Sequence, residues 1–324
     1  MQLKVTTFNL ENLFTRYSQI DDPLEKNNPR VVMSGITSMN YQGNPLSRAI
    51  TVLQRNNTAR AILDSAPDIL AVQEVENLWT LRFFNDQYLS GYFDRLILIE
   101  GNDGRGIDVG FCVRYGCSVS VTGIRTHVDD LDPSNTKVGR VSRYFNDVAN
   151  AVQVDGALFS RDCLEVDVEA GRTPLTFLVN HFKALDGIQA SNARRQAQAS
   201  RVAEFVYQIQ KRQRHPIVLG DLNEDFAATP SNLKPLKDII PSVLADPFAN
   251  EVDNFTHYFA NGNETSRLDY ILLDATLTVT SKSILRKGIT LKCAVAGERY
   301  PSVGYVDTEA SDHCPVSVTL QLDD

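Results

Sequence analysis

The chain has 324 residues, 43% hydrophobic and 22% charged, a composition that fits a globular protein and excludes a disordered tail, a collagen-like chain and a coiled coil. No apolar run reaches the roughly 18 residues of a membrane span. Acidic residues outnumber basic ones by 40 to 32, which gives a net charge of −8. This charge disfavours the binding of polyanions unless a local basic groove or a divalent metal holds them.

The start of the chain and its cysteines bear on localisation. Residues 1–8 alternate like a strand and lack the basic and apolar regions of a signal peptide. Five cysteines, an odd number without CxxC spacing, disfavour a disulfide framework or a zinc ribbon and favour a reducing interior. We therefore expect a cytoplasmic protein, with a secreted form whose leader was trimmed as the alternative.

Predicted strands and helices alternate along the chain. Residues 4–9 alternate as a strand does, residues 57–65 end an amphipathic helix, the apolar run 68–73 predicts a buried strand, and residues 78–89 predict a helix. Further strands are predicted at 96–100, 109–114, 118–124, 148–154, 164–168 and 174–180, then a long amphipathic helix at 190–213, then strands at 216–219, 256–259, 267–272 and 315–320.

Two stretches, 16–45 and 288–309, lack clean periodicity and are predicted to be loops, which at this length are functional or mobile. Strands outnumber helices, and strand–helix–strand units mix with hairpins, a pattern that two packed sheets flanked by helices would satisfy. No composition shift marks a linker. We expect one α/β domain over residues 1–324, with a loop-rich insertion at about 16–45.

Three carboxylates lie where predicted strands begin or end. Glu11 follows the first strand, Glu74 ends the buried run at 68–73, and Asp312 precedes the last strand. Each alone is more often a solvated charge, but together they offer the hard oxygen ligands that Mg²⁺ prefers. The lack of a cysteine and histidine cluster also favours a hard ion over zinc.

Acid–base residues follow other predicted strands. If the strands bearing Asp269 and preceded by His313 are neighbours, Asp269 holds the imidazole in one tautomer and favours its cation. His313 then acts as a base or stabilises phosphate charge. In Gly220-Asp221-Leu222-Asn223, Asp221 would orient or deprotonate a water and Asn223 would donate to a phosphoryl oxygen, with a plain turn as the alternative.

The histidines differ in their surroundings. His181, at the end of the strand predicted at 174–180, would donate to a phosphate oxygen or protonate a leaving group, or else be structural. The other histidines, His127, His215 and His257, lack acidic neighbours at strand ends and are interpreted as structural or surface residues.

These clusters, in this order, resemble the endonuclease/exonuclease/phosphatase superfamily, which includes deoxyribonuclease I, exonuclease III-type abasic-site endonucleases, inositol-polyphosphate 5-phosphatases and neutral sphingomyelinases. The resemblance runs from residue 7 to residue 313. Its motifs are Thr7-Phe8-Asn9-Leu10-Glu11-Asn12, Gln73-Glu74, Asn180-His181-Phe182-Lys183, Gly220-Asp221-Leu222-Asn223, Arg267-Leu268-Asp269-Tyr270 and Ser311-Asp312-His313.

The resemblance implies a four-layer α/β sandwich of two mixed sheets between helical layers. It implies hydrolysis of a phosphoester with Mg²⁺ or Mn²⁺ and no covalent intermediate. Glu74 would be the principal metal ligand, with Glu11 as a second acidic contact and Asp312 near the metal. Asn9 and Asn223 would hold the phosphate and the metal-bound water network.

The same resemblance gives the catalytic residues their expected roles. Asp221 would position the attacking water and Asp269 would orient His313, while which of Asp221 and His313 is the base stays open. His181 matches the histidine of the deoxyribonuclease and sphingomyelinase branches.

Two cations are further candidates for substrate contacts. Arg105, in Gly104-Arg105-Gly106-Ile107-Asp108, lies in a stretch that looks like one in bacterial nucleases of the superfamily, and it would reach a phosphate. Lys183 has a similar status. A local ion pair in a glycine-rich loop is the alternative for Arg105.

We therefore expect a metal-dependent phosphodiesterase, a nuclease on nucleic acid, acting as a monomer without a stable protein partner. The alternatives are a phosphatase or phosphodiesterase on a small-molecule or lipid phosphoester and, from another class, a non-catalytic binding module on the same fold. Every catalytic and metal-binding position of the motifs carries a suitable polar residue, and a non-catalytic binding module would have little reason to keep them all.

Overall fold

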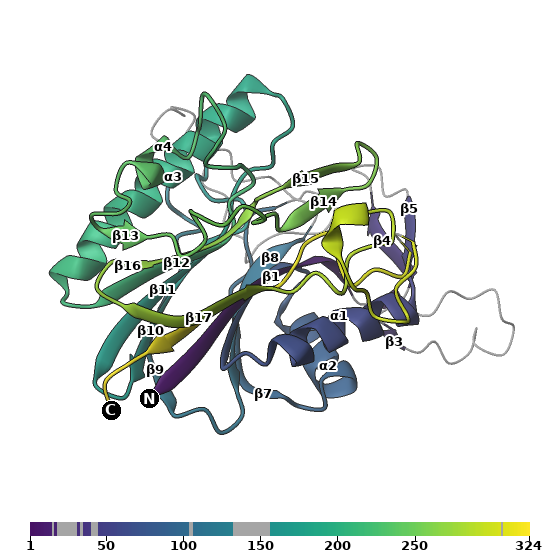
Figure 1. Cartoon of the computed structure of the whole chain (residues 1–324), viewed down its shortest axis with the longest axis horizontal. Coiled ribbons are helices and arrows are strands. Elements are labelled where there is room, and N and C mark those ends of the chain that lie inside the picture. Colours follow the sequence, from purple (N-terminus) through teal and green to yellow (C-terminus); the bar gives the residue numbers. More distant parts are fainter. Residues whose placement is uncertain are drawn as a thin grey trace, which may run out of the picture.

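The computed structural model (Figure 1) describes residues 1–14, 51–103, 106–131, 156–305 and 307–324, with the backbone of four short strands between residues 16 and 50. Within these residues, two mixed six-stranded sheets pack face to face and helices cover their outer faces. This confirms the expected four-layer α/β sandwich. The two chain ends lie together, with the Met1 amino group 2.7 Å from Asp324 Oδ1.

The first sheet has β1 near its centre. Strand β1 (Gln2–Leu13) is parallel to β6 (Ile69–Val75) and antiparallel to β18 (Val316–Gln321). Every side chain from Val5 to Leu10 is buried because the strand has protein on both faces. The strand order in this sheet is β17 (Thr278–Ile284), β18 (Val316–Gln321), β1 (Gln2–Leu13), β6 (Ile69–Val75), β8 (Asp108–Arg114) and β7 (Phe93–Leu98).

The second sheet faces the first across an apolar core. Phe111 of β8 contacts Phe177 of β11, with ring centroids 5.1 Å apart, and both side chains are fully buried. The strand order is β13 (Leu244–Ala245), β16 (Asp269–Asp274), β12 (His215–Asp221), β11 (Thr173–His181), β10 (Cys163–Ala170) and β9 (Val119–Arg125).

Each sheet has its own helical layer. Figure 1 shows α1 (Val52–Ser65) and α2 (Leu78–Tyr88) outside the first sheet, and α3 (Gln189–Lys211) and α4 (Lys234–Lys237) outside the second. Helix α1 begins after Thr51, whose hydroxyl accepts the Gln54 N–H, and such a cap satisfies a backbone donor at the helix start. The expected helices are confirmed.

The structure also corrects the prediction of elements. Strand β17 was not expected, because it is an edge strand with most side chains exposed and no apolar alternation. The predicted strand at 148–154 lies outside the described residues. In the described residues of the stretch 288–309, the one regular element is the short η3 (Ala294–Ala296), as a loop prediction implies.

The stretch 16–45 was expected to be loop-rich, and the part of it that the structure describes consists of short strands, which carry too few residues to show a period. The small ladders of the structure are β2 (Arg16–Tyr17) with β3 (Val31–Val32), β4 (Gly35–Met39) with β5 (Pro45–Ile50), and β14 (His257–Phe259) with β15 (Glu264–Ser266). No helix in the described ranges is long and apolar enough to cross a membrane.

Candidate active site

Three adjacent strands of the second sheet place polar side chains side by side. The parallel register of β11 and β12 pairs His181 with Asp221, and the antiparallel register of β12 and β16 pairs Asp221 with Asp269. All three side chains are at most 3% exposed. His181 Nε2 lies 3.5 Å from Asp221 Oδ2. The ends of these three strands therefore lie side by side at one edge of this sheet.

The turn after β12 depends on a close backbone approach. Gly220 has a φ of 127°, and a Cβ there would lie 2.0 Å from the carbonyl oxygen of Asn180, so only glycine fits. After it, the Asn223 N–H donates to Asp221 Oδ1 at 2.8 Å, and Asn223 Nδ2 donates to the Phe182 carbonyl at 3.1 Å. Asn223 thus holds the turn that orients Asp221.

In the first sheet, a bulge orients the two glutamates. The register of β1 against β6 shifts between Asn9 and Leu13, and bulges of this kind re-aim side chains beside active sites. Glu11 and Glu74 both have left-handed φ values, 47° and 62°, which is uncommon for residues with a Cβ. The Asn12 N–H donates to Glu74 Oε2 at 3.0 Å, which ties the two strands at the bulge.

Asn9 connects the two sheets. Its Nδ2 donates to Asp221 Oδ2 at 3.0 Å, and its Oδ1 accepts the Glu11 N–H at 3.1 Å. On the other side of the bulge, the fully buried Arg55 of α1 donates to the carbonyls of Leu10, Glu11 and Asn12 at 3.0–3.2 Å. Sequence reasoning missed Arg55, because a charged residue in a helix usually faces solvent.

His313 reaches Asp269 from the opposite sheet. Its Nδ1 lies 2.7 Å from Asp269 Oδ2, which also accepts the Thr256 hydroxyl at 2.7 Å. The expectation made this pair conditional on contact between the two strands, and β16 and β18 do contact each other, although they belong to different sheets. The contact forms because the sheets pack face to face and the loop before β18 crosses between them.

Burial and charge shift the ionisation of this cluster. Burial raises the pKa of Asp221 to about 7, with Asp269 adding to the rise and His313 opposing it. Burial alone would lower the pKa of His313, but the charges of Asp269 and Asp221 and the hydrogen bond to Asp269 hold that pKa well above its ordinary value. The imidazole of His313 is therefore set to carry a proton beside a carboxylate that titrates near neutrality.

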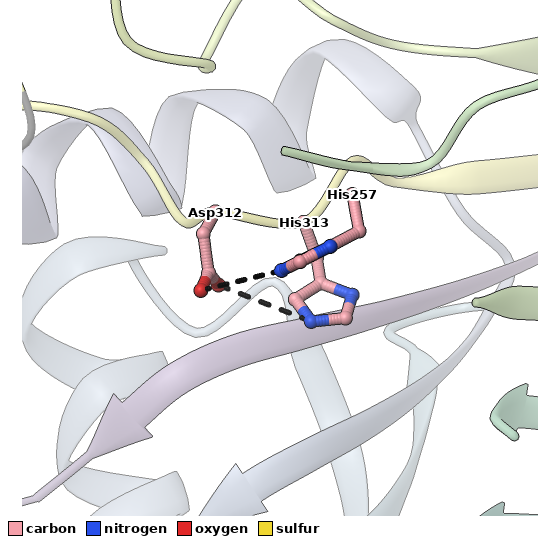
Figure 2. Close-up of side chains that lie close together, drawn as sticks. All are labelled: His257, Asp312 and His313. Atoms are coloured by element: carbon pink, nitrogen blue, oxygen red, sulfur yellow. Dashed lines mark ion pairs between the residues drawn. The ribbon is translucent and has the colours of Figure 1, made fainter. Parts of the chain in front are cut away.

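His257 also lies against this cluster, so the expectation that it has no acidic neighbour was wrong. Its ring lies 4.6 Å from that of His313, centroid to centroid, and its Nε2 lies 3.8 Å from Asp312 Oδ2 (Figure 2). Burial and the charge of His313 lower the pKa of His257 to about 4. Only the fold joins β14 to the loop before β18, so no local sequence signal marked this contact.

The residues around the bulge fit a hard divalent ion. Glu11 and Asp312 line one pocket of about 520 Å³, and both supply carboxylate oxygens. Glu74 lies against the same bulge, with its Oε1 3.9 Å from His181 Nε2. Carboxylate oxygens of this kind are the ligands that Mg²⁺ and Mn²⁺ prefer.

The two expected substrate cations have different outcomes. The Lys183 Nζ lies 3.3 Å from Asp186 Oδ2, which makes an ion pair between the two side chains. Both side chains of the pair are about one-third exposed. Arg105 lies outside the described residues.

Comparison with known proteins agrees with this architecture. The profile of the endonuclease/exonuclease/phosphatase family matches residues 7–313, whereas no curated protein sequence gives a significant match. An endonuclease/exonuclease/phosphatase structure from Bacteroides vulgatus is similar over 100% of both chains, with a TM-score of 0.60 and 16% identity.

Two eukaryotic structures are also similar. D. rerio TDP2 complexed with a single-strand DNA product covers 99% of both chains at a TM-score of 0.57 and 15% identity. The human Nocturnin catalytic domain covers 99% of this chain and 95% of its own at a TM-score of 0.58 and 14% identity. At these identities the likeness shows the fold, and the family assignment rests on the profile match: this chain belongs to the endonuclease/exonuclease/phosphatase family.

Proposed function

We propose that this chain is a divalent-metal-dependent phosphodiester hydrolase that cleaves nucleic acid by in-line attack of water on phosphorus. One observation carries the proposal: acidic and imidazole groups from both sheets form a continuous series from Glu74 through His181, Asp221 and His313 to Asp269. Each group lies within 3.9 Å of the next. Such a series supplies a metal anchor, a base and a proton donor in one place.

Each residue has a task that its contacts support. Asp221, held by Asn9 and Asn223, accepts the proton of the attacking water. His313, kept cationic by Asp269, donates from Nε2 to a phosphoryl oxygen and stabilises the charge that develops there. His181 supplies a proton to the leaving oxygen. These groups are fixed by backbone and side-chain contacts before substrate arrives, which lowers the cost of alignment.

The metal contribution is assigned to the carboxylates at the bulge. We propose that Glu74 and Glu11, with Asp312, hold Mg²⁺ or Mn²⁺. When bound, the ion neutralises charge on the phosphoryl oxygens in the transition state. Arg55 maintains the bulge that presents Glu11, and the Asn12 N–H orients Glu74.

Nucleic acid is the substrate class that family membership and the DNA-bound TDP2 structure support. One observation favours a second candidate, a small-molecule or lipid phosphoester. The pocket beside the site is lined by four acidic residues, and a polyanionic strand would meet their repulsion. They are Glu11, Asp307, Glu309 and Asp312.

Hydrolysis assays on four substrates test the proposal. Plasmid DNA, single-stranded DNA, RNA and bis-p-nitrophenyl phosphate are incubated with purified protein and Mg²⁺ or Mn²⁺, with His313→Ala as the blank. We expect metal-dependent cleavage of a nucleic acid that the blank lacks, and the product pattern separates endonuclease from exonuclease. Cleavage of the small ester alone would support the second candidate, and no cleavage of any substrate would contradict both.

A further inference from the structure

We propose that His257, Asp312 and His313 form a second metal site that takes an imidazole-preferring transition ion such as Zn²⁺. This site shares Asp312 with the carboxylate set proposed for Mg²⁺, but its other ligands differ in chemistry from Glu11 and Glu74. It uses two ring nitrogens and one carboxylate, whereas the bulge offers oxygen donors.

The backbone fixes the two histidines side by side. His257 and His313 form an isolated antiparallel bridge, and the Tyr258 N–H donates to the Asp312 carbonyl at 2.9 Å. The two imidazoles and the carboxylate of Asp312 therefore project from paired segments. Their relative positions do not depend on a flexible loop tip.

Both rings are held from behind by a hydrogen bond at Nδ1. His257 Nδ1 lies 3.0 Å from Ser266 Oγ on β15, and His313 Nδ1 lies 2.7 Å from Asp269 Oδ2. Each remaining Nε2 faces the carboxylate of Asp312, as Figure 2 shows. A histidine that binds a metal through one nitrogen commonly has its other nitrogen held in this way.

The spacing of the three ligands suits a shared ion. Asp312 Oδ2 lies 3.8 Å from His257 Nε2, and Asp312 Oδ1 lies 3.9 Å from His313 Nε2. These separations are too long for hydrogen bonds, which end near 3.2 Å. Ligands about 2.0–2.2 Å from one zinc ion lie roughly 3.3–3.6 Å apart. One ligand atom from each of the three residues lies within 4.8 Å of the others, so the side chains must move closer together to share an ion.

The site is accessible from the pocket. The Asp312 side chain is 37% exposed and lines the pocket wall, whereas the side chains of His257 and His313 are 15% and 7% exposed. Three protein ligands leave coordination positions open toward the pocket, for water or for an anionic ligand. A second acidic and histidine group in the described residues, Asp221, Asp269 and His313, is buried at all three positions, and its Asp269 and His313 hydrogen-bond directly.

An ion at this site would compete with catalysis. It would occupy the Nε2 of His313, which the proposed function assigns to the phosphoryl oxygen; this consequence rests on that proposed function, whereas the binding of the ion does not. We therefore expect Zn²⁺ to inhibit hydrolysis supported by Mg²⁺.

Zinc binding is measured directly by calorimetric titration of protein that carries no histidine tag and has been stripped with EDTA. The wild type is compared with His257→Gln, Asp312→Asn and Ser266→Ala, and with His215→Gln as a matched control. His215 lies 3.6 Å from Asp274 and is about one-third exposed. Asp312→Asn and Ser266→Ala are surface changes that keep the binding test valid if His257→Gln fails to fold.

We expect one tight zinc site in the wild type, in His215→Gln and in Glu74→Gln. Removal of His257 or Asp312 should weaken zinc binding at least tenfold, and Ser266→Ala should weaken it by about tenfold, as loss of a supporting hydrogen bond does. Co²⁺ in place of Zn²⁺ should give visible absorption bands that His257→Gln lacks. Unchanged zinc affinity in folded His257→Gln or Asp312→Asn protein, or no zinc binding by the wild type, would overturn the proposal.

The effect of Zn²⁺ on Mg²⁺-supported hydrolysis separates the proposed second metal site from the proposed function. If zinc binds as expected but Mg²⁺ supports no hydrolysis, the second site stands and the proposed function fails. If Mg²⁺-supported hydrolysis is intact and zinc neither binds nor inhibits, the function stands and the second site fails.

Discussion

The Nδ1 atom of His313 lies 2.7 Å from Asp269 Oδ2, and this contact joins the two sheets at the candidate active site. Asp269 is fully buried, and its Oδ2 is shared with the Thr256 hydroxyl. Its charge opposes the effect of burial on the pKa of His313 and favours the imidazolium form of that residue.

Asp269→Asn tests this relationship. Asparagine keeps the size of the side chain but removes the negative charge that supports the imidazolium, so we expect kcat to fall about 100-fold or more. The kcat of His313→Ala should fall at least as far. Circular dichroism should show a native fold in both variants, and His215→Gln should retain activity. Near-wild-type turnover in folded Asp269→Asn would show that the pair has no catalytic role.

Glu74→Gln tests the metal assignment. The amide keeps a hydrogen-bond acceptor for the Asn12 N–H but loses the charge that attracts a divalent ion. We expect a loss of about 100-fold or more in Mg²⁺-supported rate, partly recovered at high Mg²⁺ concentration. Glu76→Gln, the same change two residues along, is the control and should keep its activity. Equal rates for the two variants would remove Glu74 from the metal site.

The pH profile tests the role of Asp221. The groups that face it are His181, His313 and Asp269, with Asn9 donating a hydrogen bond. Because the pKa of Asp221 is raised to about 7, the carboxyl is protonated below that pH and cannot accept a proton. We therefore expect the rate to rise with pH through about 7.

Asn9→Ala sharpens the same test. The hydrogen bond from Asn9 lowers the pKa of Asp221, so its loss should move the rising limb of the profile to higher pH, whatever happens to the maximal rate. A rising limb near pH 4, or one that Asn9→Ala leaves in place, would contradict Asp221 as the base.

Arg55→Met tests whether the bulge positions Glu11. The fully buried guanidinium satisfies three backbone carbonyls, and methionine leaves them without a donor. We expect the free energy of unfolding to fall by about 2–4 kcal/mol and the Mg²⁺ requirement of the surviving activity to rise. Arg82→Met, at an exposed position of α2, should change neither. An unchanged Mg²⁺ requirement would show that Arg55 has only a structural role.

Much of the second-sheet site follows from local patterns. His181 and Asp221 each follow a short apolar run, and such runs form central strands whose ends meet at one edge of the sheet. The register then decides which side chains touch. The same reasoning located Glu74, but it could not show the left-handed backbone that turns this side chain.

Contacts between distant segments were beyond sequence reasoning. His257 meets His313 only because β14 bridges the loop before β18, and neither segment carries a signal for the other. Lys183 was expected at the phosphate because of its position in a motif, whereas its described partner is Asp186, three residues away. Charge complementarity at short range decided that contact.

Removal and return of metal tests the central claim most directly. Hydrolysis of bis-p-nitrophenyl phosphate and of the cleaved nucleic acid is measured with EDTA, and then with Mg²⁺, Mn²⁺ or Zn²⁺ in excess. We predict that EDTA abolishes activity, that Mg²⁺ or Mn²⁺ restores it, and that Zn²⁺ restores it poorly. Undiminished hydrolysis in the chelator would contradict a metal-dependent phosphodiesterase.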